Sequence, residues 1–331
     1  MESLGNAIVN RQESTPSADD LTGSNLEAPA RLGIQLGSLN LKNPVLTASG
    51  TFGYGEEMGS FFDVSQLGAV VCKTVTRASR AGNPPPRTCE TSAGMLNAIG
   101  LQNVGAQRFI EEKLPYLRQL KTPIIVNIAG ETLEDFAALA GEMGAQAGVA
   151  ALELNISCPN VAHGMDFSTD AGAAEAVVKA VRRATSTPLI VKLSPNVTDI
   201  GLIARAVEAG GADAISAVNT FVGMAIDIRR RRPRLSNGVG GLSGPAIKPL
   251  ALRAVYRCAQ SVRIPLIGIG GIVTGEDAIE FLLAGASAIQ VGTATFAQPA
   301  AALQVVQGIE SYLREHRISD VREIIGALSF K

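Results

Sequence analysis

The stretch Asn155-Ile156-Ser157-Cys158-Pro159-Asn160 gathers several groups that could do chemistry directly after a mostly apolar run, 149–154. Its two asparagine amides can hold a planar polar ligand by hydrogen bonds, and its thiol can move a proton once it is ionised. A lone Cys158 beside a Pro-Asn turn would more often be a buried structural residue. The prediction of a site therefore depends on what the rest of the chain places beside this stretch.

Polar residues also close several other apolar runs. Any one of them could be a surface residue, but together they predict a site that several strands share. The groups are Ala48-Ser49-Gly50, Lys73-Thr74, Asn127, Lys192-Leu193-Ser194 and Asn219-Thr220.

Eight such apolar runs alternate with longer connections, and connections such as 201–209 and 249–262 have the spacing of amphipathic helices. This alternation, with glycine-rich joints, predicts an α/β fold, a (β/α)8 TIM barrel. A doubly wound open sheet is the alternative, but the G-x-G-x-x-G turn expected after its first strand is absent. The predicted strands are 44–49, 69–75, 123–128, 150–156, 188–193, 214–219, 265–269 and 286–292.

The last two predicted strands end in glycine. The sequences Gly268-Ile269-Gly270-Gly271 and Val291-Gly292-Thr293 would let backbone N–H groups approach an anion closely. Ordinary turn glycines are the alternative in a chain with 35 of them. Because barrels usually bind phosphate in the loops after strands 7 and 8, we interpret these glycines as a phosphate site.

Lys192 has three interpretations that the residues alone leave open. It could form a Schiff base, extend to the surface, or act as a fixed positive charge. A flavin ring gains negative charge near its N1–C2=O edge on reduction, and a fixed lysine there would stabilise that charge.

Composition narrows the class of protein. A net charge of −1 over 331 residues argues against a nucleic-acid surface as the main role. We expect no membrane span, since no apolar stretch approaches the roughly 20 residues required. We expect no signal peptide, since the N-terminus has no basic region followed by an apolar core. Four scattered cysteines and two histidines predict no metal site and reduced thiols in a cytoplasm.

Polar, aperiodic residues 1–30 predict a flexible or loosely attached extension before a barrel at 31–331.

In combination, these motifs resemble those of a known enzyme family. The resemblance is carried by 155–160, Lys192-Leu193-Ser194-Pro195, Asn43-Pro44, Gly82-Asn83-Pro84, 97–103 and Gly241-Leu242-Ser243-Gly244-Pro245. Over residues 32–296 the chain resembles dihydroorotate dehydrogenase of the soluble class 1 type. The form Gly-Met-Leu-Asn-Ala-Ile-Gly-Leu-Gln-Asn at 94–103 is more similar to the NAD-linked B-type catalytic subunit than to the fumarate-linked A-type.

The resemblance implies an FMN-containing barrel that oxidises dihydroorotate to orotate in pyrimidine biosynthesis. By carry-over, Cys158 is the base that takes the C5 proton while the C6 hydride passes to flavin N5. A free thiol with a pKa of ~8.5 is mostly protonated at neutral pH, so either its surroundings help or activity rises with pH. Residues 159–170, with Gly164 as a candidate hinge, correspond to a lid over the substrate.

The same resemblance implies two sets of binding residues. The substrate set is Lys73, Asn97, Ile99, Gly100, Leu101, Asn155, Asn160, Asn219 and Thr220. The FMN set is Ala48, Ser49, Gly50, Lys73, Thr74, Asn127, Asn155, Lys192, Gly244, Gly270, Gly271, Gly292 and Thr293.

The resemblance also implies a partner, because B-type catalytic subunits work with a second chain that carries FAD and an iron–sulfur cluster. A homodimer or a heterotetramer is expected. The basic run Arg229–Arg232, followed by Arg234, is either a solvated loop or a contact to such a partner.

Three other functions stay open at this point. A dihydropyrimidine-type flavin dehydrogenase shares a Cys-Pro after the fourth strand, although those enzymes usually carry cysteine-rich iron–sulfur segments. A non-flavin nucleotide-binding barrel with a catalytic Cys, similar to inosine monophosphate dehydrogenase, would use the same phosphate loops. A non-catalytic ligand-binding barrel would not depend on the Cys158 thiol.

Overall fold

The computed structural model describes residues 29–157 and 167–330, and its centre is one eight-stranded parallel sheet. A parallel bridge between Leu46 and Ala69 joins the first strand of the sheet to the last, so the sheet closes into a barrel. The predicted barrel and all eight predicted strands are confirmed, and the open-sheet alternative is wrong. In spatial order the strands are β3 (Val45–Thr47), β16 (Ala288–Val291), β15 (Leu266–Ile269), β10 (Ala214–Ala217), β9 (Leu189–Leu193), β8 (Val149–Asn155), β7 (Ile124–Ile128) and β4 (Val70–Val75).

The barrel strands are continuously apolar because both of their faces are covered. Every residue of β7 and β9 is buried, and β3, β10, β15 and β16 share this pattern. Strands covered by side chains inside and helices outside read as unbroken Val, Ile and Leu runs, not as alternating ones. Polar side chains buried in such strands, as at Asn127, Glu153 and Lys192, therefore need partners inside the barrel.

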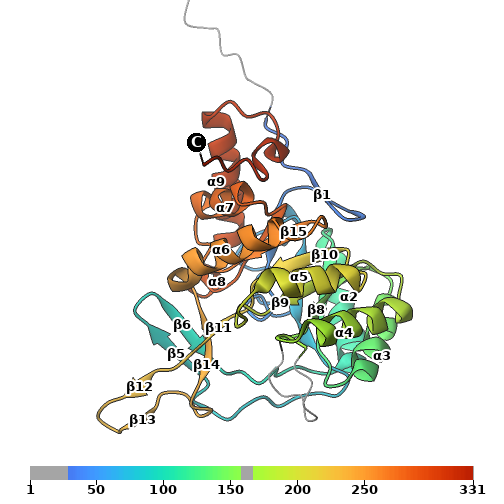
Figure 1. Ribbon diagram of the computed structural model, residues 1–331, viewed down its shortest axis with the longest axis vertical. Coiled ribbons are helices and arrows are strands. Elements are labelled where there is room, and N and C mark those ends of the chain that lie inside the picture. The colour runs from blue at the N-terminus through green and yellow to red at the C-terminus, as the bar shows by residue number, and fades with distance from the viewer. Residues whose placement is uncertain (1–28, 158–166, 331) are drawn as a thin grey trace, which may run out of the picture.

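Helices form the outer layer around the strands (Figure 1). Side-chain caps at Thr132, Asp170, Asp199 and Thr274 accept backbone N–H groups and fix where four of these helices begin. The main outer helices are α3 (Leu133–Gly144), α4 (Ala171–Ala184), α5 (Ile200–Ala209), α6 (Lys248–Ala259), α7 (Gly275–Leu283) and α9 (Ala301–Glu315). Shorter helical segments are η2 (Val64–Gln66), α1 (Ala106–Arg108), η3 (Phe109–Lys113), α2 (Leu114–Leu117), η4 (Arg118–Leu120), η5 (Pro245–Ile247), α8 (Ala294–Ala297) and η6 (Val321–Ile324).

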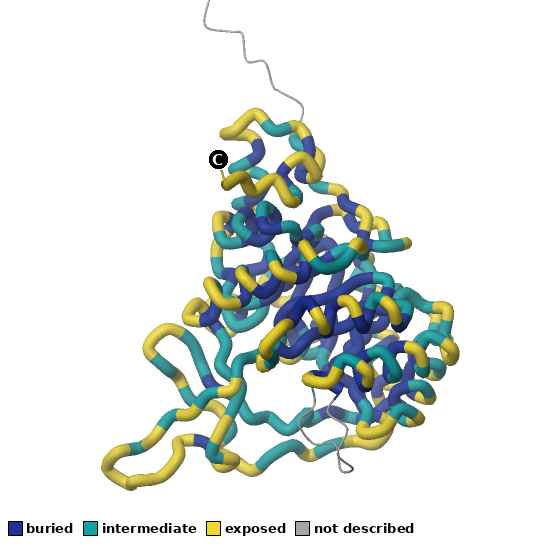
Figure 2. Tube along the Cα trace, in the orientation of Figure 1, coloured by how far each residue is buried: buried dark blue, intermediate teal, exposed yellow. Residues whose placement is uncertain are grey.

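Two excursions from the barrel build a second, antiparallel sheet with the order β11-β14-β6-β5. The first excursion follows β4, and the second follows β10. Their strands are β5 (Thr88–Thr91), β6 (Gly94–Asn97), β11 (Phe221–Gly223), β14 (Gly240–Ser243), and the short pair β12 (Ile226–Asp227) and β13 (Arg232–Pro233). Figures 1 and 2 show the second excursion as an arm that leaves the barrel and is mostly exposed at its tip.

The start of the described chain is attached to its end. The hairpin of β1 (Ile34–Leu36) and β2 (Leu39–Leu41) turns at Gly37, and Arg31 pairs with Asp320 after α9. The extension predicted at 1–30 lies, apart from its last two residues, outside the described residues. Across 29–157 and 167–330, no helix is long and apolar enough to cross a membrane.

Candidate active site

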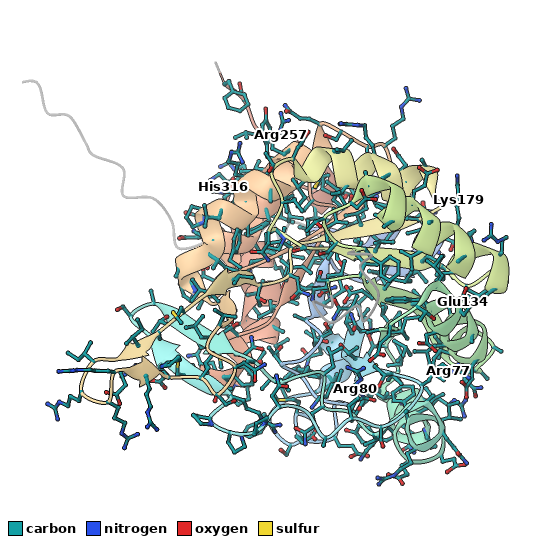
Figure 3. The ribbon with its side chains drawn as sticks, turned by 60° about the horizontal axis from the view of Figure 1, so that its bottom comes forward. Arg77, Arg80, Glu134, Lys179, Arg257 and His316 are labelled. Carbon is teal, nitrogen blue, oxygen red and sulfur yellow. The ribbon has the colours of Figure 1, made fainter. Side chains whose placement is uncertain are left out.

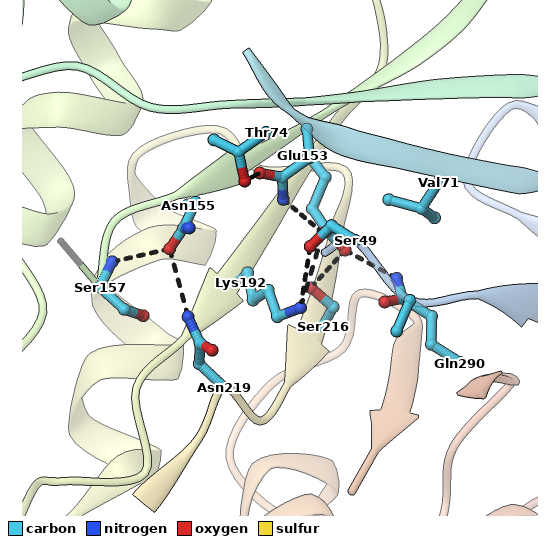
Figure 4. A network of polar contacts seen from close by, with 12 residues as sticks. Ser49, Val71, Thr74, Glu153, Asn155, Ser157, Lys192, Ser216, Asn219 and Gln290 are labelled. Carbon is cyan, nitrogen blue, oxygen red and sulfur yellow. Dashed lines mark hydrogen bonds and ion pairs between the residues drawn. The ribbon is translucent and has the colours of Figure 1, made fainter. Parts of the chain in front are cut away.

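A chain of polar contacts crosses the barrel interior near the carboxyl ends of its strands (Figure 4). Thr74 Oγ1 donates to Asn127 Oδ1 at 2.6 Å, and Asn127 Nδ2 donates to a carboxylate oxygen of Glu153 at 2.6 Å. Lys192 Nζ donates to Ser49 Oγ at 3.3 Å. Four residues predicted for the cofactor, from four different strands or strand ends, therefore meet in one network.

Glu153 is the centre of this network, and it was missed in the sequence prediction. Its side chain is fully buried on β8, and it also accepts hydrogen bonds from Ser216 Oγ at 2.9 Å and Gln290 Nε2 at 2.7 Å. Lys192 Nζ lies 3.9 Å from its Oε1. The signal in the sequence is a single charged residue inside the otherwise apolar run 149–154, a run that by its pattern predicts only a buried strand.

A second group of amides stands at the end of β8. Asn155 Oδ1 accepts from the Ser157 backbone N–H and from Asn219 Nδ2, both at 3.3 Å, and Thr220 N–H donates to Asn219 Oδ1 at 2.9 Å. Ser157 Oγ is buried and has no hydrogen-bond partner in the described part of the chain. The structure thus brings together the predicted amides of two adjacent regions.

Cys158, Asn160 and most of the predicted lid at 159–170 lie outside the described residues. Their predicted roles remain predictions.

The end of β6 and the loop after it carry four further residues predicted to bind substrate. Asn97 Nδ2 donates to the Gly241 carbonyl at 3.3 Å, which attaches β6 to β14. Ile99, Gly100 and Leu101 follow and are half-buried, with φ of +74° at Gly100 and +53° at Leu101. A Cβ at Gly100 would lie 2.7 Å from the Asn83 backbone nitrogen, so only glycine fits this close approach.

Lys73 lies half-buried on β4 beside a second cation. Burial lowers the pKa of its ammonium, the positive charge of Arg87 lowers it further, and Glu57 acts in the opposite direction. Two neighbouring cations with one weaker acidic neighbour favour an anion, such as a substrate carboxylate.

Glycines form a close-packed cradle beside the network. Gly271, after β15, has a φ of +76°, and a Cβ there would lie 2.9 Å from Lys248 N and 3.0 Å from Gly244 O. Gly244 itself is buried with a φ of +93°. Thr293 Oγ1 donates to Ser243 Oγ at 2.9 Å, which joins the loop after β16 to the end of β14.

The other predicted cofactor residues surround this cradle. Gly270 also has a positive φ, +131°, and a Cβ at Gly292 would meet the buried Ala48 side chain at 3.2 Å. Gly50 has a φ of +87° with open space around its Cβ position. Backbone N–H groups that a ligand can approach without Cβ atoms in the way fit a phosphate-bearing cofactor.

The donor set also fits a flavin ring. An amide, an ammonium and hydroxyls face one region, and Gln290 Oε1 is a buried acceptor without a partner among the described residues. Orphaned buried polar atoms in a native site need an explanation, and a bound polar ligand supplies one.

Other reactive side chains of the described chain lie elsewhere. Burial raises the pKa of the Cys72 and Cys258 thiols to about 12, which makes both poor bases. His316 stacks on Tyr312 at the surface end of α9, and Figure 3 shows it among peripheral charged side chains. Within the described ranges, no group of three His, Cys, Asp or Glu residues could hold a metal ion.

Comparison with known proteins agrees with this geometry. The family model for dihydroorotate dehydrogenase matches residues 31–313. A relative from Trichlorobacter lovleyi is 57% identical over 90% of this chain and 98% of its own length, and one from Geobacter sp. strain M21 is 54% identical with the same coverage. Both relatives are named dihydroorotate dehydrogenase B (NAD(+)), catalytic subunit. With the barrel, the buried polar network and the glycine cradle in place, the chain belongs to the dihydroorotate dehydrogenase family.

Proposed function

We propose that this chain is the catalytic chain of an NAD-linked dihydroorotate dehydrogenase, which oxidises dihydroorotate to orotate with FMN. The carrying observation is the convergence of Asn127, Lys192 and the glycine cradle on one end of the barrel, beside Lys73 and the Asn155–Asn219 pair. This arrangement offers separate places for a phosphate-bearing ring system and for a small planar anion.

Bound FMN supplies the hydride acceptor of the reaction. Lys192 and Asn127 would face the polar edge of the ring, while the cradle around Gly271 would hold the phosphate. A fixed ammonium stabilises negative charge that develops on a reduced flavin, and it needs no reorganisation during the reaction.

The substrate residues bind and orient dihydroorotate. Lys73 would pair with its carboxylate, and Asn155 and Asn219 would pair with its amide edges. Asn97 and the backbone of 99–101 would close the opposite side of the site. Cys158 would then remove the C5 proton, which places the thiolate as general base.

An anaerobic visible spectrum of the purified chain, before and after addition of dihydroorotate, tests this function. We expect a flavin spectrum that bleaches with dihydroorotate and stays oxidised with a dihydropyrimidine that lacks the carboxylate. Bleaching by the dihydropyrimidine alone would assign the chain to the dihydropyrimidine-type dehydrogenases. A chain that cannot be reconstituted with FMN would refute the proposal.

We further propose that the arm at 221–240 contacts a partner subunit that carries FAD and an iron–sulfur cluster. Val222, Met224, Ile226 and Ile228 are exposed at alternate positions, and Ile228 is 84% exposed. Beside them, Arg229–Arg231 are exposed at the tip between β12 and β13, and the exposed Arg232 begins β13. Exposed aliphatic and methionine side chains next to arginines are typical of protein interfaces.

Removal of the arm's charges tests this contact. The variant with Arg229–Arg232 changed to Ala should bind the electron-transfer subunit more weakly and reduce NAD more slowly, with dihydroorotate-driven flavin bleaching intact. A matched control removes four exposed arginines of the outer layer, at Arg205, Arg253, Arg314 and Arg317. Equal binding of the partner by the arm variant and the wild type would exclude this contact.

The homodimer or heterotetramer and the cytoplasmic location are further parts of the proposal. Scattered, unpaired cysteines support a reducing compartment: Cys72, Cys89 and Cys258 are free thiols. Sedimentation of the chain with and without the partner measures the assembly directly.

A further inference from the structure

Glu153 is a buried carboxylate whose acceptor positions are filled mainly by neutral groups. Asn127 Nδ2 donates to Oε1, and Ser216 Oγ and Gln290 Nε2 both donate to Oε2. Three directed donors fix the orientation of the carboxylate. None of these donors carries a charge, so they leave the negative charge without compensation.

Lys192 supplies the opposite charge from a short distance but without direct contact. Its Nζ is 3.9 Å from Glu153 Oε1, which is too far for a hydrogen bond. Among the described residues, Ser49 Oγ at 3.3 Å is the acceptor that the ammonium reaches. Lys192 and Glu153 therefore form a long ion pair without a hydrogen bond, while neutral donors bond the carboxylate oxygens (Figure 4).

No other charge in the described barrel interior replaces this pair. The buried charged residues are Glu153, Lys192 and Asp320, and Asp320 lies beyond α9, where it is paired with Arg322 and Arg31. The nearby Cys72 thiol stays protonated, because burial foremost and Glu153 to a lesser extent raise its pKa to about 12. Glu153 and Lys192 consequently depend on each other for charge compensation.

We propose that Glu153 is a positioning residue of the flavin site: it keeps the Lys192 ammonium charged inside the barrel, while its neutral donors leave that ammonium without a hydrogen bond to the carboxylate. This inference rests on the proposed flavin chemistry of the site. Under this proposal the buried carboxylate affects the reduction potential of the cofactor through Lys192, and it does not touch the substrate.

The Glu153→Gln variant is suited to the test because the network can adapt to it. An amide at 153 presents one NH2 group where the carboxylate had an acceptor. Gln290 Oε1 is buried without a partner, so a flip of the Gln290 amide would let this oxygen accept from the new NH2. The substitution thus removes the charge, keeps the shape of the side chain and leaves the new amide a hydrogen-bond acceptor in the FMN-free protein.

The first measurement is thermal unfolding of the FMN-free protein for Glu153→Gln, Lys192→Met and the double variant. Each single variant leaves one buried charge uncompensated, whereas the double variant leaves none. We expect both single variants to lower the unfolding midpoint, and the double variant to lower it by clearly less than the two losses combined. Additive losses would overturn the dependence of one residue on the other.

The second measurement is the midpoint potential of bound FMN in the same variants. An uncompensated buried lysine releases its proton, so Glu153→Gln should remove the same positive charge as Lys192→Met does. We expect Glu153→Gln and the double variant to share one potential, lower than that of the wild type, and Lys192→Met to give a potential at least as low, because the Glu153 carboxylate remains in that variant. A potential raised or unchanged by Glu153→Gln would overturn the proposal, because the carboxylate would then act on the flavin independently of Lys192.

Thr47→Val is the matched control for general damage to the core. Thr47 is fully buried, and its hydroxyl bonds the Val71 backbone outside the Glu153 network. The Thr47→Val variant should lower the unfolding midpoint and leave the midpoint potential of bound FMN unchanged. If the wild type binds no FMN, the proposed function fails, while unfolding of the FMN-free variants still decides whether Glu153 and Lys192 depend on each other.

Discussion

Glu153 and Lys192 lie on adjacent strands, two residues out of register, and their charged atoms are 3.9 Å apart inside the barrel. Glu153 pairs with Ile190, and Lys192 pairs with Asn155. Because side chains alternate along a strand and paired residues point to the same side of a sheet, residues 153 and 155 of β8 and residues 190 and 192 of β9 all share one face. The amide that would contact substrate and the lysine that would contact flavin are therefore placed by the same register.

Substitution of Cys158 should separate binding from chemistry. Cys158→Ala should retain FMN and dihydroorotate and lose about 10²- to 10⁴-fold in the rate of flavin reduction, because the general base is gone. The wild-type rate should rise with pH as the thiol ionises, and the variant should lack this rise. Stopped-flow bleaching at several pH values measures both, with Cys89→Ala as the thiol control on β5. Full-speed reduction in Cys158→Ala would refute the assignment.

Lys73 should make substrate affinity depend on pH. Because burial and Arg87 lower the pKa of its ammonium, the positive charge is lost at a lower pH than in an exposed lysine. The dissociation constant of dihydroorotate should therefore rise as the solution becomes alkaline. Lys73→Gln should weaken binding by about 10- to 100-fold at neutral pH and remove this dependence.

The lowered pKa of Lys73 should affect folding stability with the opposite sign: stability rises with pH, whereas substrate affinity falls. Between the lowered folded pKa of Lys73 and its unfolded value, the unfolded chain binds more protons, so stability rises with pH in that window.

The Arg87→Gln variant removes the second cause of the lowered Lys73 pKa. Titration of substrate binding should then show weakening at a higher pH than in the wild type. An unchanged binding profile in that variant would exclude Arg87 as a cause.

Gly271→Ala should weaken FMN binding. A methyl group there would lie 2.9 Å from Lys248 N, and the φ of +76° is unfavourable for alanine by about 1–2 kcal/mol. Gly238→Ala is a matched control, since its φ is +79° but no atom lies within 4 Å of the added methyl group. Fluorescence titration of FMN should show a dissociation constant at least about tenfold higher for Gly271→Ala alone. Similar weakening in both variants would assign the effect to backbone strain.

Asp320 should stabilise the closure between residue 31 and the C-terminal segment. Its hydrogen bond from Arg322 Nε, at 2.8 Å, is the main cause that lowers its pKa to about 2, and Arg31 contributes at 3.2 Å. Asp320→Asn should lower the free energy of unfolding at pH 7 by on the order of 1–2 kcal/mol.

This contribution should disappear in acid. The folded pKa of Asp320 is about 2 and the unfolded value is ~3.9, so its stabilisation is complete above the unfolded value and is lost as pH falls through the folded one. Urea unfolding of both proteins should show a difference that shrinks from pH 5 towards pH 2. A difference that stays constant over this range would contradict the role of the carboxylate charge.

The sequence by itself determined the barrel and the positions of most candidate residues. Strands covered on both faces must be apolar along their whole length, so β7 and β9 were visible as unbroken runs. A polar residue at the end of such a run, for example Asn155, lies at the open end of the barrel by topology alone. The motifs at 155–160 and 192–195 are therefore predicted from the sequence to share one site.

Only the tertiary structure decided which of these residues touch. The partners of Glu153 lie 26, 63 and 137 positions away in the chain, at Asn127, Ser216 and Gln290. Local periodicity carries no information about such pairs, because strand register and barrel closure set them. The neighbourhood of Lys73 and Arg87, and the contact between Gly271 and Gly244, follow in the same way from how separate loops pack.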